Sequence, residues 1–165
     1  MGKRVFAFTV LVSSMLVLAA CGAQATPTTS PTAAPAATTA PVATIPDSAT
    51  VKVADSSLGK ILVDDKGWVL YMYTKDTANT SVCYDQCQKN WPPLLTKNKP
   101  TPGAGADVSL IGTTTRKDGT LQVTYKGLPL YYFIKDTAAG ETKGQDVAKV
   151  WYVVSPAGDA IGMSK

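Results

Sequence analysis

Short apolar runs separated by turn residues dominate the chain from about residue 59 onward, and this spacing predicts strands rather than long helices. Residues 61–74 form the pattern of a β-hairpin with its turn at 64–67, where Gly67 supplies a positive φ. Residues 121–134 repeat the pattern around a turn at 126–127. The sequence therefore predicts two similar hairpins.

Alternation along the second strand of the first hairpin decides which side chains point together. Tyr71 and Tyr73 share one face, whereas Leu70 and Met72 share the other, and the two faces are not cleanly divided into a polar and an apolar one. We expect both faces to be covered, as in the central strands of a small sandwich or a compact barrel. The predicted fold class is mainly β, a small sandwich or compact barrel of short antiparallel hairpins.

One short segment has a helical composition. Residues 81–90 contain no glycine or proline, Ser81 is suited to cap the helix, and two prolines follow soon after its end. Cys83 and Cys87, at positions i and i+4, would lie on one face of this helix. The equivalent residues after the second hairpin, 140–149, are polar and rich in glycine, which argues against a second helix.

A fixed shift of 60 residues relates the two hairpins. Residues 70–76 return as 130–136, and the same shift without a gap also aligns two of the tryptophans. A constant period with matching aromatic residues, glycines and acids indicates a duplicated structural unit. We place the two repeats at about 59–95 and 119–155.

The N-terminal residues have the composition of a targeting segment. Lys3 and Arg4 precede an apolar run at 5–17, which is followed by Leu-Ala-Ala and then Cys21. This arrangement resembles the lipobox of bacterial lipoproteins, in which the Cys thiol receives a diacylglyceryl group. We therefore expect residues 1–20 to be a lipoprotein signal peptide, and Cys21 to carry the lipid that anchors an exported protein to the membrane. An ordinary secretory signal with an incidental cysteine is the alternative.

The next segment differs in composition from the rest of the chain. Together with Cys21, residues 22–46 form a stretch rich in Ala, Thr and Pro that lacks charge and hydrophobic periodicity up to residue 46. Such a stretch buries too little apolar surface to fold and suits an extended tether. We expect it to hold a folded domain, residues 47–165, away from the membrane.

Charge and residue usage exclude several classes of function. Removal of residues 1–20 takes away Lys3 and Arg4, so the formal charge falls from +4 to +2, with the lysines scattered among acids. This argues against a nucleic-acid partner. The chain has no histidine, which excludes a Ser-His-Asp triad and removes the commonest ligand for zinc and haem. We expect no metal site and no cofactor.

Once Cys21 is assigned to lipid, Cys83 and Cys87 remain as an even pair in an oxidising compartment. A disulfide is the default there, and it would clip a short local loop. A reactive or metal-binding CxxxC pair is the alternative.

The repeated hairpin strand carries a motif. Its residues are Tyr71, Tyr73 and Asp76 in the first copy, and Tyr131, Phe133 and Asp136 in the second. They resemble the bacterial secreted-repeat lipoprotein family with the Yx(F/W/Y)xxD motif, as do the two cysteines, the Trp-Pro-Pro-Leu after them and the later Trp-Tyr-Val-Val. The resemblance implies a fold and an extracytoplasmic location. It implies no activity, because the family is described as being of unknown function.

Two sets of residues have both a structural and a functional interpretation. Asp76 and Asp136 follow strands, where an aspartate normally accepts backbone N–H groups in a turn, but they also suggest a catalytic carboxylate pair. The aromatic residues suit a small β core or a binding groove. Three tryptophans are possible binding residues: Trp68, which lacks an aromatic counterpart in the second repeat and which we expect to be exposed, Trp91 and Trp151.

We therefore expect a lipid-anchored, non-enzymatic module that binds a protein or glycan of the cell envelope or has a structural role there. The alternative is an envelope glycan hydrolase that uses Asp76 and Asp136, whose carboxyl groups would have to lie about 5 to 10 Å apart. A lesser alternative is a thiol redox or electron-transfer protein that uses Cys83 and Cys87.

Overall fold

The computed structural model describes residues 44–163. The predicted signal peptide, Cys21 and residues 22–43 of the tether lie outside the described residues. Within the part of the chain that the structure describes, no helix is long and apolar enough to cross a membrane.

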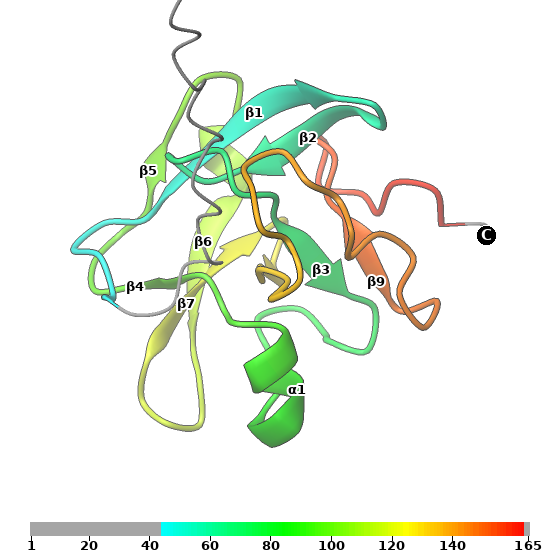
Figure 1. Cartoon of the computed structure of the whole chain (residues 1–165). Coiled ribbons are helices and arrows are strands. Elements are labelled where there is room, and N and C mark those ends of the chain that lie inside the picture. The colour runs from blue at the N-terminus through cyan, green and yellow to red at the C-terminus, as the bar shows by residue number, and fades with distance from the viewer. Residues whose placement is uncertain (1–43, 164–165) are drawn as a thin grey trace, which may run out of the picture. The chain divides into compact units, whose positions relative to one another are not determined.

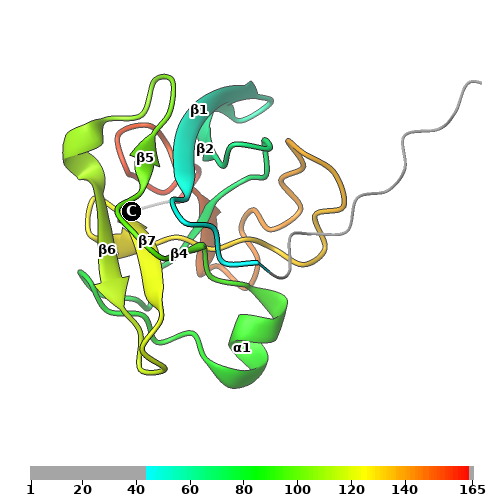
Figure 2. The ribbon, with the colours of Figure 1, turned by 90° about the vertical axis from the view of Figure 1, so that its left-hand side faces the viewer.

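The described chain begins with a hairpin that the sequence patterns did not reveal. Strand β1 (Thr50–Ser56) pairs antiparallel with β2 (Gly59–Val63), and Gly59 has a φ of 95° at the start of β2. The short β5 (Thr101–Pro102) runs parallel to the first residues of β1. In Figures 1 and 2 this hairpin and α1 (Asp85–Asn90) lie at opposite ends of the domain.

A second sheet is built around β7. Strand β7 (Leu121–Tyr125) pairs antiparallel with β4 (Leu95–Thr96), β6 (Ile111–Thr115) and β8 (Leu128–Pro129). The short 3₁₀ helix η1 (Val108–Leu110) leads into β6. The turn between β7 and β8 uses two residues with positive φ, Lys126 and Gly127, which matches a two-residue hairpin loop. The second predicted hairpin is thereby confirmed.

The first predicted hairpin is present in a less regular form. Val63 and Val69 form an isolated antiparallel bridge, and the Leu70 N–H donates to the Leu62 carbonyl over 3.0 Å. The strand then continues as β3 (Tyr71–Tyr73), which pairs with β9 (Trp151–Val153) rather than with β2.

The duplication is visible as approximate two-fold symmetry. The β1–β2 hairpin corresponds to β6–β7, and the pair of Tyr71 with Val153 corresponds to a bridge between Tyr131 and Pro93. The first repeat has prolines at 92 and 93, where the second has the strand β9. Because proline has no N–H to donate, only an isolated bridge forms on that side.

Helix α1 is shorter than predicted. It spans six residues rather than 81–90, Tyr84 occupies the N-cap position, and Cys83 lies before the helix rather than on one of its faces. The prediction that Ser81 caps the helix is wrong, because its hydroxyl is bound to Tyr131 at 2.7 Å instead. Residues 140–149 form turns and one isolated bridge at Val147 rather than a helix, as the composition indicated.

Two hydrophobic clusters lie on opposite faces of β3. Leu70 and Met72 belong to one cluster, whereas Tyr71 and Tyr73 contribute to the other. The prediction that both faces are covered is thereby confirmed. The fold is mainly β, with small mixed and antiparallel sheets and one short helix, and no sheet among residues 44–163 closes into a barrel.

Candidate functional site

The motif tyrosines and aspartates pair across the two repeats. The Tyr71 hydroxyl donates to Asp136 Oδ2 over 2.7 Å, and the Tyr131 hydroxyl donates to Asp76 Oδ2 over 2.6 Å. All four residues are buried, with Asp76 6% and Asp136 2% exposed. Each repeat therefore supplies the phenol that satisfies the carboxylate of the other.

The second oxygen of each carboxylate holds a loop. Asp76 Oδ1 accepts the Val82 N–H over 2.8 Å, and Asp136 Oδ1 accepts the Lys143 N–H over 3.0 Å. These contacts span longer loops than the short turn expected from the sequence. Both Oδ1 atoms nevertheless accept backbone N–H groups, as the structural interpretation of the two aspartates requires.

Burial dominates the electrostatics of this pair of sites. It raises the pKa of the Asp136 carboxyl to about 6, although the hydrogen bonds from Tyr71 and Lys143 favour the ionised form. Burial also raises the pKa of Asp76, against the hydrogen bonds from Tyr131 and Val82.

Aromatic rings of the two repeats interleave beside these bonds. Tyr73, Trp151, Trp91 and Phe133 stack in that order, with centroids 4.2, 3.9 and 4.2 Å apart and interplanar angles of 13°, 4° and 23°. Tyr71 meets Trp91 edge-on at 5.4 Å. Tyr131 meets Trp151 edge-on at 5.2 Å, as the approximate symmetry requires.

The three tryptophans selected as possible binding residues are all buried. Trp68, Trp91 and Trp151 are 4%, 5% and 4% exposed. The expectation that Trp68 is exposed is wrong, because it packs in the cluster that contains Leu70 and Met72. Trp91 and Trp151 fill the space between the repeats, so their rings contribute to the core rather than to a surface groove.

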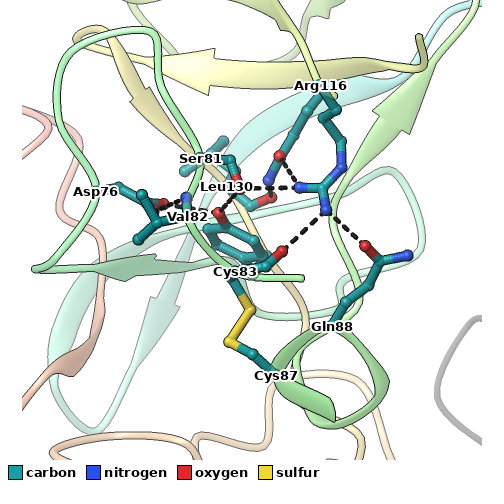
Figure 3. Close-up of a disulfide and its surroundings, with 10 residues drawn as sticks. Asp76, Ser81, Val82, Cys83, Cys87, Gln88, Arg116 and Leu130 are labelled. Carbon is teal, nitrogen blue, oxygen red and sulfur yellow. Dashed lines mark hydrogen bonds between the residues drawn. A yellow bond between two sulfur atoms is a disulfide. The ribbon is translucent and has the colours of Figure 1, made fainter. Parts of the chain in front are cut away.

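Cys83 and Cys87 form a disulfide, with their Cα atoms 5.2 Å apart. Cys83 is fully buried and belongs to the same hydrophobic cluster as Trp91, with Cys87 packed against it. The bridge ties the loop before α1 to the middle of the helix (Figure 3).

A buried arginine beside the disulfide was missed by sequence reasoning. The Arg116 side chain is fully buried, and its guanidinium donates to four neutral acceptors: Ser81 Oγ, Gln122 Oε1, the Cys83 carbonyl and Gln88 Oε1. Figure 3 shows it reaching between the β6–β7 region and the disulfide loop. The only hint in the sequence is Gln122, a polar residue in an otherwise strand-like run.

These groups form one directed chain of hydrogen bonds. Arg116 donates to Ser81, Ser81 and Tyr131 share a bond of 2.7 Å, and Tyr131 donates to Asp76. Because the Tyr131 proton is directed at Asp76, Ser81 is the donor to the phenol oxygen. A guanidinium and a carboxylate are thus joined through two hydroxyls. In the second repeat the Gly144 N–H donates to Tyr71 over 3.2 Å in place of this chain.

A separate cleft of about 430 Å³ lies where the tether enters the domain. Its lining includes Asp64, Asp65, Lys66, Pro92, Pro93 and Tyr132. Asp64, which is 4% exposed, accepts the N–H groups of Lys66 and Trp68 and the Tyr132 hydroxyl. The sequence predicts a turn at 64–67 but gives no sign that Asp64 is buried within it.

Among residues 44–163, no group of three or more His, Cys, Asp or Glu side chains is placed to hold a metal ion.

A protein-family model matches the chain at two stretches. A lipoprotein family described as a secreted repeat of unknown function matches residues 52–95 and again 112–155, so each match includes most of β1 or β6 in addition to the predicted hairpin. No curated protein and no solved structure matches the chain significantly. The two matches cover more than half of the chain, which therefore belongs to the secreted-repeat lipoprotein family, with two copies of the repeat.

Proposed function

We propose that this chain is a lipid-anchored, extracytoplasmic module that binds a component of the cell envelope rather than a catalyst. The observation that carries the proposal is the reciprocal pairing of the motif residues. Both carboxylates of the motif have each oxygen hydrogen-bonded inside the protein, to Tyr131 and Val82 or to Tyr71 and Lys143. Groups used in this way stabilise the fold, and this supports a non-enzymatic role over a glycan hydrolase.

The anchor in this proposal is Cys21. The family is one of secreted lipoproteins, and Leu-Ala-Ala-Cys at residues 18–21 fits a lipobox. A tether of 25 residues, if extended, reaches roughly 80 Å. The domain would then meet its partner well away from the membrane surface.

The cleft beside the tether is the contact surface we favour. Asp65 and Lys66 are exposed at its edge, and the prolines at 92 and 93 and Tyr132 supply apolar area. A few polar groups around an apolar recess suit a glycan or an extended peptide of the envelope.

Labelling with a palmitate analogue tests the anchor. The wild-type protein should be labelled and should remain with membranes, whereas Cys21→Ala should be unlabelled and released. Cys87→Ser serves as the control, because it also removes a cysteine but should leave labelling unchanged. Equal labelling of wild type and Cys21→Ala would contradict the assignment.

A thermal-shift screen of the purified chain against envelope glycans and short peptides tests binding. A ligand at about 100 times its Kd adds roughly 2.7 kcal/mol of stability. The shift should be lost in Lys66→Glu and kept in Val108→Ala, an exposed residue that does not line the cleft. Hydrolysis of envelope glycan by the chain, abolished by Asp76→Asn or Asp136→Asn, would overturn the non-enzymatic proposal.

A further inference from the structure

The aromatic column between the repeats connects a buried tyrosine to the protein surface. From Tyr71 the ring contacts run to Trp91 at 5.4 Å, to Trp151 at 3.9 Å and to Tyr73 at 4.2 Å. Tyr71 is 0% exposed, whereas Tyr73 is only partly buried. Rings in van der Waals contact exchange electrons readily, so this series is a continuous path from the core to solvent.

The buried end of the path has a base for the phenol proton. Asp136 Oδ2 lies 2.7 Å from the Tyr71 oxygen, within the range for direct proton transfer. A phenol loses an electron far more easily when its proton passes to a base in the same step, because the protonated phenol radical is a very strong acid. The raised pKa of the Asp136 carboxyl, about 6, makes it a better proton acceptor than an ordinary carboxylate while leaving it ionised at neutral pH.

The two repeats differ at this point, although their rings are arranged alike. Tyr131 also donates to a carboxylate, but its oxygen accepts a bond from Ser81, which Arg116 binds in turn. Burial raises the pKa of Asp76 overall, and the hydrogen bonds from Tyr131 and Val82 oppose it, with a smaller opposing effect from the nearby guanidinium. The guanidinium also disfavours removal of an electron from this site. Tyr71, which accepts a backbone N–H from Gly144 instead, is the more easily oxidised of the pair.

We propose that the column is a one-electron relay that ends at Tyr71. An outer-sphere one-electron oxidant at the Tyr73 end of the column removes an electron from the stacked tryptophans Trp151 and Trp91, and the electron is replaced from Tyr71. The Tyr71 O–H bond breaks as its proton moves to Asp136. The products are a neutral tyrosyl radical, a protonated carboxyl group and the oxidant reduced by one electron. An external thiol or quinol can return the electron while releasing its own proton to solvent, and the proton held on Asp136 then moves back to the phenol oxygen. This role goes beyond envelope binding and does not depend on it.

Photo-oxidation of the purified full chain by a ruthenium(II) polypyridyl complex with a cobalt(III) quencher tests the relay, with electron paramagnetic resonance as the readout. Wild-type protein should give a neutral tyrosyl radical. Tyr71→Phe should lose that signal and show a tryptophan radical, whereas Tyr131→Phe, its symmetry-related control, should keep it. An unchanged tyrosyl signal in Tyr71→Phe, or its loss in Tyr131→Phe alone, would overturn the proposal.

Two further measurements test the proposal without requiring that Tyr71→Phe folds. Tyr125→Phe should also keep the signal, because this buried phenol donates to the Pro156 carbonyl and has no carboxylate partner. In wild-type protein the radical yield should fall as pH drops through about 6, when Asp136 takes up a proton. The charged groups that face Asp136 are Glu141 and Lys143, besides the Tyr71 phenol. A yield that is equal on both sides of this pH would refute Asp136 as the proton acceptor.

Discussion

Tyr71 and Tyr131, the first residues of the two motif copies, are joined by a reciprocal pair of backbone hydrogen bonds. The N–H of each donates to the carbonyl of the other, over 2.8 and 2.9 Å. This pair of bonds lies at the approximate two-fold axis that relates the two repeats. The hydroxyl group of each tyrosine consequently donates a hydrogen bond to the motif aspartate of the other repeat. The duplicated motif is therefore a device for joining two repeats into one domain.

We expect Tyr131→Phe to destabilise the domain by about 1–3 kcal/mol, because the buried Asp76 carboxylate loses its phenol donor. Tyr71→Phe should have a similar effect through Asp136. Urea denaturation provides the measurement. Lys75→Ala is the control, because Lys75 is exposed and directly precedes Asp76 in the chain, and it should change stability by less than about 0.5 kcal/mol. A wild-type midpoint for Tyr131→Phe would show that the cross-repeat bond does not stabilise the fold.

The sequence predicts the parts of this interface but not their pairing. The 60-residue shift identifies both motifs and their hairpins, and the alternation correctly places Tyr71 and Leu70 on opposite covered faces. Local reasoning could only give Asp76 a partner within its own turn. The actual phenol partner lies 55 residues away, and no local pattern reports such a contact.

The sequence also did not predict that two individual residues, Trp68 and Arg116, are buried. Trp68 lacks an aromatic counterpart in the second repeat and so resembled a surface residue, but it fills the core on its own. Arg116 opens a polar turn, where an arginine is normally solvated. Its burial depends on acceptors from residues 81–88 and from β7, which only the tertiary fold brings together.

Loss of the disulfide should weaken the domain moderately. Cys83→Ser is expected to lower the free energy of unfolding by about 2 kcal/mol, since the closed loop is short and the entropy it removes from the unfolded chain is small. Chemical denaturation of the variant and of the reduced wild type should give matching midpoints. If reduction leaves the wild-type midpoint unchanged, the disulfide does not contribute to stability.

Removal of the buried guanidinium should cost more. Arg116→Ala leaves the Cys83 carbonyl and the side-chain oxygens of Gln88 and Gln122 without their donor, and we expect a loss of about 3 kcal/mol. Arg116→Lys should not restore stability, because one ammonium group cannot reach the same set of acceptors. Lys117→Ala is the matched control from the same turn. Equal denaturation midpoints for Arg116→Ala and Lys117→Ala would contradict this role.

The raised pKa of Asp136 predicts an unusual dependence of stability on pH. In the folded state the pKa is about 6, above the ordinary value of 3.8, so folding favours the protonated carboxyl. This contribution is complete below the ordinary value and is lost as pH rises through about 6. Burial raises the pKa of Asp64 and Asp76 as well, which acts in the same direction.

Urea midpoints measured across this range should therefore fall from about pH 4 to about pH 7, by at most roughly 3 kcal/mol from Asp136. Asp136→Asn should flatten the profile, because its amide does not titrate. Glu141→Gln is the informative control: its carboxyl has a pKa lowered to about 2, chiefly by Lys143, so it affects stability only at more acidic pH. A profile for Asp136→Asn as steep as that of the wild type would show that another group causes the dependence.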